Sequence, residues 1–123
     1  MVIISPKRKV LIVDDSRLIQ TRIMESLKDV DNDKMIYQAF NCKDAMELFS
    51  SLEPEFVILD LELPDGSGIN LLRKFKEINS GVNVIIFTNY ATSEFKNSCM
   101  DLRALHFIDK SNFLSLINTM KSL

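Results

Sequence analysis

Three short apolar runs constrain the fold of this chain more than any other feature of its sequence. Residues 10–13, 56–59 and 84–87 read VLIV, FVIL and VIIF, with no polar interruption and many β-branched side chains. Runs of this length and composition are typical of strands that are covered on both faces, as in parallel sheets. Residues 35–40 and 106–109 also have the length of strands, so we predict five strands in total.

Between these runs, apolar residues recur three or four positions apart. This spacing places the side chains of each set on one face of a helix. The sets are Ile19, Ile23 and Leu27; Ala45, Leu48, Phe49 and Leu52; Leu71, Phe75 and Ile78; and Phe113, Leu116, Ile117 and Met120. A further helix is expected over residues 93–104, although its apolar face is poorly defined. The alternation predicts an α/β fold: a doubly wound five-stranded parallel sheet in the flavodoxin-like order 2-1-3-4-5, with helices on both faces.

Length, charge and cysteine content narrow the class of protein. A chain of 123 residues fits one domain, which we place over residues 1–123 with its core at about 9–120. The net charge of −2 and the pI of 5.4 make nucleic acid and membrane surfaces poor partners. Cys42 and Cys99 lack the spacing of a zinc or redox motif, and the apolar run at 1–4 precedes its basic residues, the reverse of a secretory signal. We therefore expect a soluble, cytoplasmic protein.

Polar residues that carry chemistry follow the predicted strands. Asp14 and Asp15 follow the first, Asp60 the third, Thr88 the fourth and Lys110 the fifth. In doubly wound sheets, ligands bind outside the carboxyl ends of the strands, where the strand order reverses. Three carboxylates gathered there would repel one another unless a cation neutralised them, and Mg²⁺ prefers such oxygen ligands beside a phosphate group. The lysine supplies a point charge and the threonine a hydroxyl donor for phosphate oxygens.

The ordered set of these residues resembles a known family. It consists of Asp14-Asp15, the segment DLELPDGSG at 60–68, Thr88 and the segment FIDK at 107–110. Together they resemble the bacterial two-component response regulator receiver domain, in the single-domain form of the chemotaxis regulators. The resemblance extends from about Lys9 to Met120. It implies a signalling domain that accepts a phosphoryl group from a histidine kinase or a histidine phosphotransfer protein.

The resemblance also implies a role for each site residue. Asp60 is the expected phosphoryl acceptor, assisted by Thr88 and Lys110. The expected ligands of Mg²⁺ are Asp15, Asp60 and the backbone carbonyl of Glu62, with Asp14 placing a metal-bound water. Self-phosphorylation and autodephosphorylation that depend on Mg²⁺ are expected, although the chain is interpreted as a signalling module rather than an enzyme.

An output surface follows from the same resemblance. Thr88 is expected to move toward the phosphoryl group, and Phe107 to enter the space that it leaves. The surface that changes would be the helix at 93–104, the strand that begins at His106 and the helix at 112–120. A downstream partner protein is expected to dock there.

Some positions depart from the common receiver pattern. Ser111 stands where a proline often follows the lysine, which puts the usual rigidity of that loop in doubt. Phe107 replaces the more frequent tyrosine, so a switch there has no phenolic hydrogen bond. Glu62 and Tyr90 lie two positions beyond Asp60 and Thr88, where they flank the path of an attacking water and are expected to tune the lifetime of the phosphoryl group.

Other interpretations of these residues remain open from the sequence. Asp14, Asp15 and Ser16 are also typical of a strand end followed by a helix N-cap. A phosphatase with an aspartyl nucleophile would use Asp60 and Glu62 but leave the aspartate pair without a role. A flavin-binding electron carrier shares the expected fold but needs a hydroxyl-rich phosphate loop. The main alternative is a receiver-like scaffold that binds partners without being phosphorylated.

Overall fold

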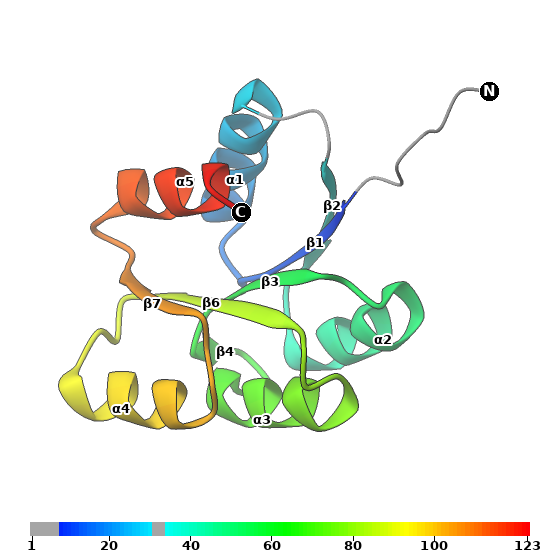
Figure 1. The fold of residues 1–123 in the computed structure, drawn as a ribbon, viewed down its shortest axis with the longest axis vertical. Helices are drawn as coiled ribbons and strands as arrows, with labels where there is room; N and C mark the ends of the chain where they lie inside the picture. The colour runs from blue at the N-terminus through cyan, green and yellow to red at the C-terminus, as the bar shows by residue number, and fades with distance from the viewer. Residues whose placement is uncertain (1–7, 31–33) are drawn as a thin grey trace.

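The computed structural model describes residues 8–30 and 34–123, and it is built on one parallel sheet. Its strands are β1 (Arg8–Val13), β2 (Lys34–Ala39), β3 (Phe56–Leu59), β6 (Asn83–Thr88) and β7 (His106–Asp109). They lie in the order β2-β1-β3-β6-β7 (Figure 1). The predicted five-stranded sheet and its flavodoxin-like order are therefore confirmed. The strand order reverses at β1 and β3, which lie side by side.

Helices cover both faces of the sheet. Helices α1 (Arg17–Val30) and α5 (Phe113–Lys121) lie on one face, and α2 (Cys42–Leu52), α3 (Gly68–Ile78) and α4 (Ser93–Asp101) lie on the other (Figure 1). Among the described residues, no helix combines the length and the hydropathy that a membrane span needs. The connections between strands and helices at the carboxyl ends of β1, β3, β6 and β7 all lie at the same edge of the sheet.

The core has one layer on each side of the sheet, because successive side chains of a strand point to opposite faces. Leu11 and Val13 pack under α2 and α3, whereas Val10 and Ile12 pack under α1 and α5. All four are fully buried, as expected for a strand covered on both faces. Between α2 and α3, the rings of two phenylalanines, Phe49 and Phe75, stack with centroids 4.1 Å apart.

Two features differ from the sequence-based expectation. The helix predicted over 93–104 ends at Asp101, because Arg103 adopts a left-handed conformation with φ of 66° that a helix cannot continue through. The segment after β3 forms a small antiparallel hairpin, β4 (Glu62–Leu63) and β5 (Gly66–Ser67), which no pattern in the sequence indicated. This hairpin connects the third strand of the chain to α3.

Candidate functional site

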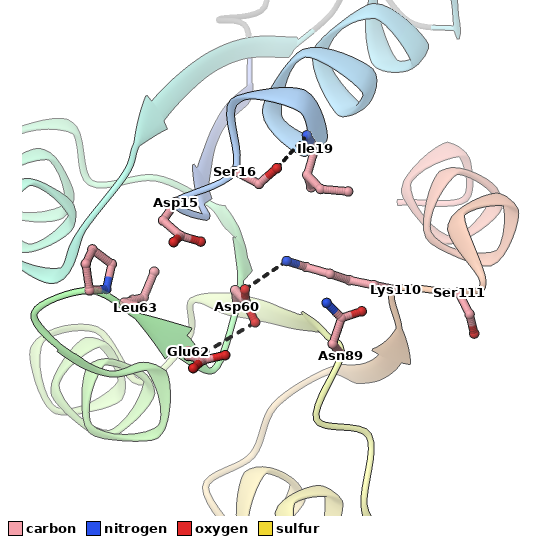
Figure 2. Close-up of a pocket in the computed structure, with 10 residues that line it drawn as sticks. Asp15, Ser16, Ile19, Asp60, Glu62, Leu63, Asn89, Lys110 and Ser111 are labelled. Carbon is pink, nitrogen blue, oxygen red and sulfur yellow. Dashed lines mark hydrogen bonds and ion pairs between the residues drawn. The ribbon is translucent and has the colours of Figure 1, made fainter.

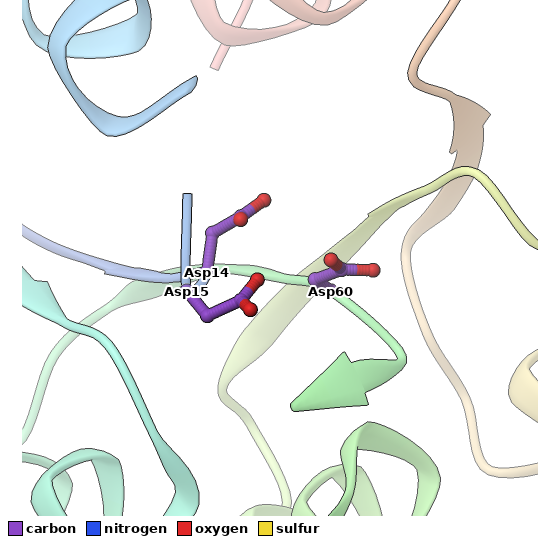
Figure 3. A group of neighbouring side chains, drawn as sticks. All are labelled: Asp14, Asp15 and Asp60. Carbon is purple, nitrogen blue, oxygen red and sulfur yellow. The ribbon is translucent and has the colours of Figure 1, made fainter. Parts of the chain in front are cut away.

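The predicted cluster of aspartates forms at the carboxyl ends of β1 and β3. Val13 pairs with Leu59 in the parallel register, and the amide of Asp60 donates to the carbonyl of Val13 at 3.0 Å. This register brings Asp14 and Asp15 beside Asp60, and carboxylate oxygens of all three lie within 4.8 Å of one another (Figure 3). Asp14 and Asp60 are buried, whereas Asp15 is exposed.

The turn between β1 and α1 fixes the aspartate pair and starts the helix at the same time. The amide of Ser16 donates to the Asp14 carboxylate at 2.9 Å, and the Ser16 hydroxyl oxygen accepts from the amide of Ile19 at 3.2 Å. Ser16 is therefore an N-cap of α1. The capping interpretation of this turn is confirmed, and it is compatible with a site that uses the carboxylates of Asp14 and Asp15.

One residue that holds this turn was missed by the sequence-based reasoning. Gln20 is fully buried, and its side-chain amide nitrogen donates to the carbonyls of Ile12, Asp14 and Ala39 at 3.1, 3.1 and 2.9 Å. It thereby ties α1 to the ends of β1 and β2. Its oxygen Oε1 is buried and has no hydrogen-bond partner within residues 8–30 and 34–123. The only sequence signal was a polar residue next to the apolar face of a predicted helix, beside Ile19 and Ile23.

Lys110 bridges the two buried aspartates. Its Nζ lies 2.8 Å from an oxygen of Asp14 and 2.8 Å from an oxygen of Asp60, and 9% of its side-chain surface is exposed. The amide of Lys110 donates to the carbonyl of Thr88 at 2.9 Å, which sets the lysine at the end of β7. Burial lowers the pKa of Lys110, but the two carboxylates outweigh this and raise it, so the lysine stays charged.

Burial shifts the pKa of Asp14 in the opposite direction to that of Lys110. It raises the pKa of Asp14, although the hydrogen bond from Lys110 and the amide of Ser16 oppose the shift. Among the described residues, Lys110 pairs with the two buried carboxylates, and the exposed carboxylate of Asp15 lies beside them. The excess of negative charge and the all-oxygen donor set fit a hard divalent cation such as Mg²⁺.

The loop that follows Asp60 is packed tightly against the start of α3. The amide of Glu62 approaches an oxygen of Asp60 at 3.4 Å, and the amide of Gly68 donates to the carbonyl of Leu61 at 2.8 Å. A Cβ on Gly68 would lie 2.1 Å from the carbonyl oxygen of Asp60, so no other residue fits this backbone. The glycine that ends the segment at 60–68 is therefore required by close packing beside Asp60.

The two predicted switch residues lie on neighbouring strands. Thr88 is fully buried on β6, and its hydroxyl oxygen accepts from the amide of Tyr90 at 3.1 Å. Phe107 on β7 pairs with Ile86 in the register and packs, partly buried, against the core on the α2–α4 side. A hydrogen bond with Glu62 raises the pKa of the Tyr90 phenol. Glu62 and Tyr90, which lie two positions beyond Asp60 and Thr88, therefore interact with each other.

An open cleft of about 580 Å³ exposes this group to solvent (Figure 2). Asp15, Asp60 and Glu62 line it together with Lys110, and their side chains point toward a common centre in Figure 2. The cleft lies at the switch point of the sheet, where ligands of doubly wound folds bind. Asp60 lines the cleft, so its carboxylate faces the open space there.

Comparison with known proteins decides the family. The sequence matches the response regulator receiver domain over residues 10–120. The chain belongs to this family. As a receiver domain it is a signalling domain of two-component systems, and the resemblance seen in its motifs is confirmed. Receiver domains bind Mg²⁺ in an acidic pocket, and this chain has an acidic cluster of Asp14, Asp15 and Asp60 at the strand ends.

Two relatives illustrate the family. Sporulation initiation phosphotransferase F of Bacillus subtilis is 34% identical over 102 residues, which cover 80% of this chain and 79% of that protein. A protein-glutamate methylesterase/protein-glutamine glutaminase of Clostridium acetobutylicum is 32% identical over 106 residues, which cover 85% of this chain and 31% of that protein. The chain thus spans about a third of the length of the methylesterase relatives that it matches.

Solved structures show the same fold. A receiver domain protein from Methanospirillum hungatei has a TM-score of 0.86 at 24% identity, and the match covers 94% of this chain and 92% of that one. The signal receiver domain of a DNA-binding response regulator from Colwellia psychrerythraea has a TM-score of 0.88 at 24% identity, with 94% and 97% covered.

Proposed function

We propose that this receiver accepts a phosphoryl group on Asp60 in a reaction that depends on Mg²⁺. The observation that supports the proposal is the grouping of Asp60 with Lys110, Asp14 and Asp15 at the base of an open cleft. The Asp60 carboxylate is largely buried but lines the cleft, its negatively charged neighbours require a cation, and an ammonium group already contacts it. The phosphoryl donor would be a histidine kinase or a histidine phosphotransfer protein, and the receiver would then act in the cytoplasm.

The chemical step needs little from the protein except position and charge. An oxygen of Asp60 attacks the phosphorus of a donor phosphohistidine and forms a P–O bond while the P–N bond breaks. The electron pair leaves with the imidazole nitrogen, which takes up a proton. Asp60 becomes an acyl phosphate, and Lys110 moves from its carboxylate contact to an oxygen of the transferred group, where it offsets the developing charge.

The residues around Asp60 suit a bound metal ion. Asp15, Asp60 and the backbone carbonyl of Glu62 would hold Mg²⁺ directly, and Asp14 would hold it through a water. The ion, when bound, neutralises charge on the phosphoryl oxygens. Hydrolysis of the acyl phosphate by water would return Asp60 to its starting state.

The output would come from a change in packing next to the site. Thr88 would donate its hydroxyl to a phosphoryl oxygen, and this movement would weaken its contact with the amide of Tyr90. Phe107, already partly buried on the neighbouring strand, would rotate into the vacated space, and its apolar ring loses no hydrogen bond there. The face made by α4, β7 and α5 would then present a changed surface to a partner protein.

Amide chemical shifts test this switch. Addition of beryllofluoride with Mg²⁺, as a mimic of the phosphoryl group, should shift the amides of Phe107 and of α4 and α5 as well as those of the cleft. Shifts confined to the acidic cleft would refute the proposed output while leaving the acceptor role intact.

The mass of the whole protein tests the acceptor. Wild-type protein incubated with Mg²⁺ and acetyl phosphate should gain one phosphoryl group, and Asp60→Asn should gain none because an amide is a far poorer nucleophile. A scaffold that works without phosphorylation would gain none in either form. Equal labelling of both proteins would place the acceptor elsewhere.

A further inference from the structure

The hairpin β4–β5 is anchored at its tip to a helix that is distant in the sequence. Asp65, between the two strands, accepts the amide of Cys42 at 2.7 Å and the amide of Lys43 at 3.1 Å. These amides belong to the first turn of α2, where helical N–H groups have no partner within the helix. The local cap of the same helix is Asn41, whose side chain accepts the amide of Asp44 at 2.8 Å. Helix α2 therefore begins with two caps, one local and one supplied by the hairpin.

The remote cap is a strong one. A carboxylate that accepts backbone amides at a helix N-terminus gains both charge-assisted hydrogen bonds and a favourable interaction with the helix dipole. The hydrogen bond from the amide of Cys42, followed by that from Lys43, lowers the pKa of Asp65 and keeps it ionised at neutral pH. The hairpin tip is also close-packed, because a Cβ on Gly66 would lie 3.1 Å from Sγ of Cys42.

The anchored hairpin carries a residue of the site. Its first strand begins at Glu62, which pairs with Ser67, and its second residue, Leu63, is buried in the core. The Glu62 amide lies 3.4 Å from an oxygen of Asp60. The hairpin is therefore held at its base by Gly68 and in its middle by Leu63, and its tip is held by Asp65. Loss of the tip contact would remove one of these three restraints and allow the backbone of Glu62 a larger shift.

We propose that Asp65 is a positioning residue for the metal side of the phosphoacceptor site: by tying the hairpin to the start of α2, it holds the backbone carbonyl of Glu62 in place beside Asp60. This inference rests on the proposed function, because it takes that carbonyl as a ligand of Mg²⁺. Residues that orient metal ligands typically change metal affinity by 10- to 100-fold when they are removed. Since Glu62 would supply one ligand among several, we expect a change of about tenfold for Asp65→Ala.

The test is a Mg²⁺ titration of the intact protein, followed by the amide shifts of Asp15 and Glu62. Asp65→Ala should bind Mg²⁺ about tenfold more weakly than wild type. Asp65→Asn keeps one oxygen acceptor and should fall between the two. Asn41→Ala is the matched control, because it removes the other cap of α2 without touching the hairpin. Both alanine variants should lower the urea midpoint, but Asn41→Ala should keep the wild-type affinity for Mg²⁺.

The outcomes separate this inference from the proposal on which it rests. Wild-type affinity in Asp65→Ala, or equal weakening in Asn41→Ala, would overturn the positioning role even if wild-type protein is phosphorylated on Asp60. A wild-type protein whose Asp15 and Glu62 amides do not respond to Mg²⁺ would overturn the metal site itself, and the role of Asp65 with it.

Discussion

Substitution of Gly68 by alanine should damage both stability and phosphorylation. The added Cβ would lie 2.1 Å from the carbonyl oxygen of Asp60 and 2.6 Å from Cα of Leu61. Both are backbone atoms, so the loop and α3 must separate by roughly 1 Å to restore ordinary contact. Forced repacking of this kind costs about 1–3 kcal/mol, and the hydrogen bond from Gly68 to Leu61 contributes about 1 kcal/mol more. The better helix propensity of alanine recovers less than about 1 kcal/mol, so we expect a net loss of about 1–4 kcal/mol.

The other two glycines of the chain provide graded controls. A Cβ on Gly66 would meet Sγ of Cys42 at 3.1 Å, whereas a Cβ on Gly81 would meet an oxygen of Asn79 at 3.5 Å, an ordinary contact. Urea unfolding followed by circular dichroism should therefore rank the alanine variants in stability as Gly81, then Gly66, then Gly68.

The same shift should slow the chemistry. Displacement of a reacting group by about 1 Å can cost on the order of 100-fold in rate. Folded Gly68→Ala should therefore incorporate phosphate at least about tenfold more slowly than Gly81→Ala. If Gly68→Ala is as stable and as reactive as Gly81→Ala, the close approach of α3 to Asp60 is not a constraint and the reasoning is wrong.

Three further substitutions test other contacts of the site. Lys110→Met removes the ammonium group beside Asp14, so the pKa of Asp14, followed by carboxyl NMR, should rise further. Phosphorylation should slow by about 100-fold or more. An unchanged titration of Asp14 would contradict the ion pair with Lys110. Gln20→Met should lower the free energy of unfolding in urea by about 1–2 kcal/mol, because three carbonyls lose a donor while removal of the unpaired Oε1 offsets part of the loss. An unchanged free energy of unfolding would refute the role of Gln20 in holding α1 to the strand ends. Glu62→Gln should lower the pKa of Tyr90, because Glu62 is the main cause of its rise and the remaining carboxylate, Asp60, has the smaller effect. Absorbance titration, with the other tyrosine replaced by phenylalanine, checks this, and an unchanged value would exclude the contact.

Local sequence signals were enough to predict the sheet and the acidic cluster. The strands at 10–13 and 56–59 are continuous apolar runs because both of their faces are buried, and this burial leaves a clear pattern. Once the strand order is known, the residue after each run must lie at the same edge of the sheet. The grouping of Asp14 with Asp60 therefore follows from the alternation of elements, and so does the approach of Lys110 to both.

Contacts between distant segments left no such pattern. Asp65 lies in a turn that any polar residue could occupy, and its role depends on the amides of α2, more than twenty residues earlier. Gln20 differs from an ordinary helix residue only in that its face meets the ends of two strands. The end of α4 was also misplaced, because its weak apolar face gave no boundary and the left-handed Arg103 is not a glycine.

The most direct test of the account is chemical mapping of the phosphorylated residue. Wild-type protein is incubated with acetyl phosphate in the presence or absence of Mg²⁺, and borohydride then reduces any acyl phosphate to an alcohol. Peptide mass spectrometry should find homoserine in place of Asp60, and only in the sample with Mg²⁺. Homoserine at Asp14 or Asp15 instead, or labelling that does not depend on Mg²⁺, would contradict the assignment of Asp60 as the acceptor in a metal-dependent site.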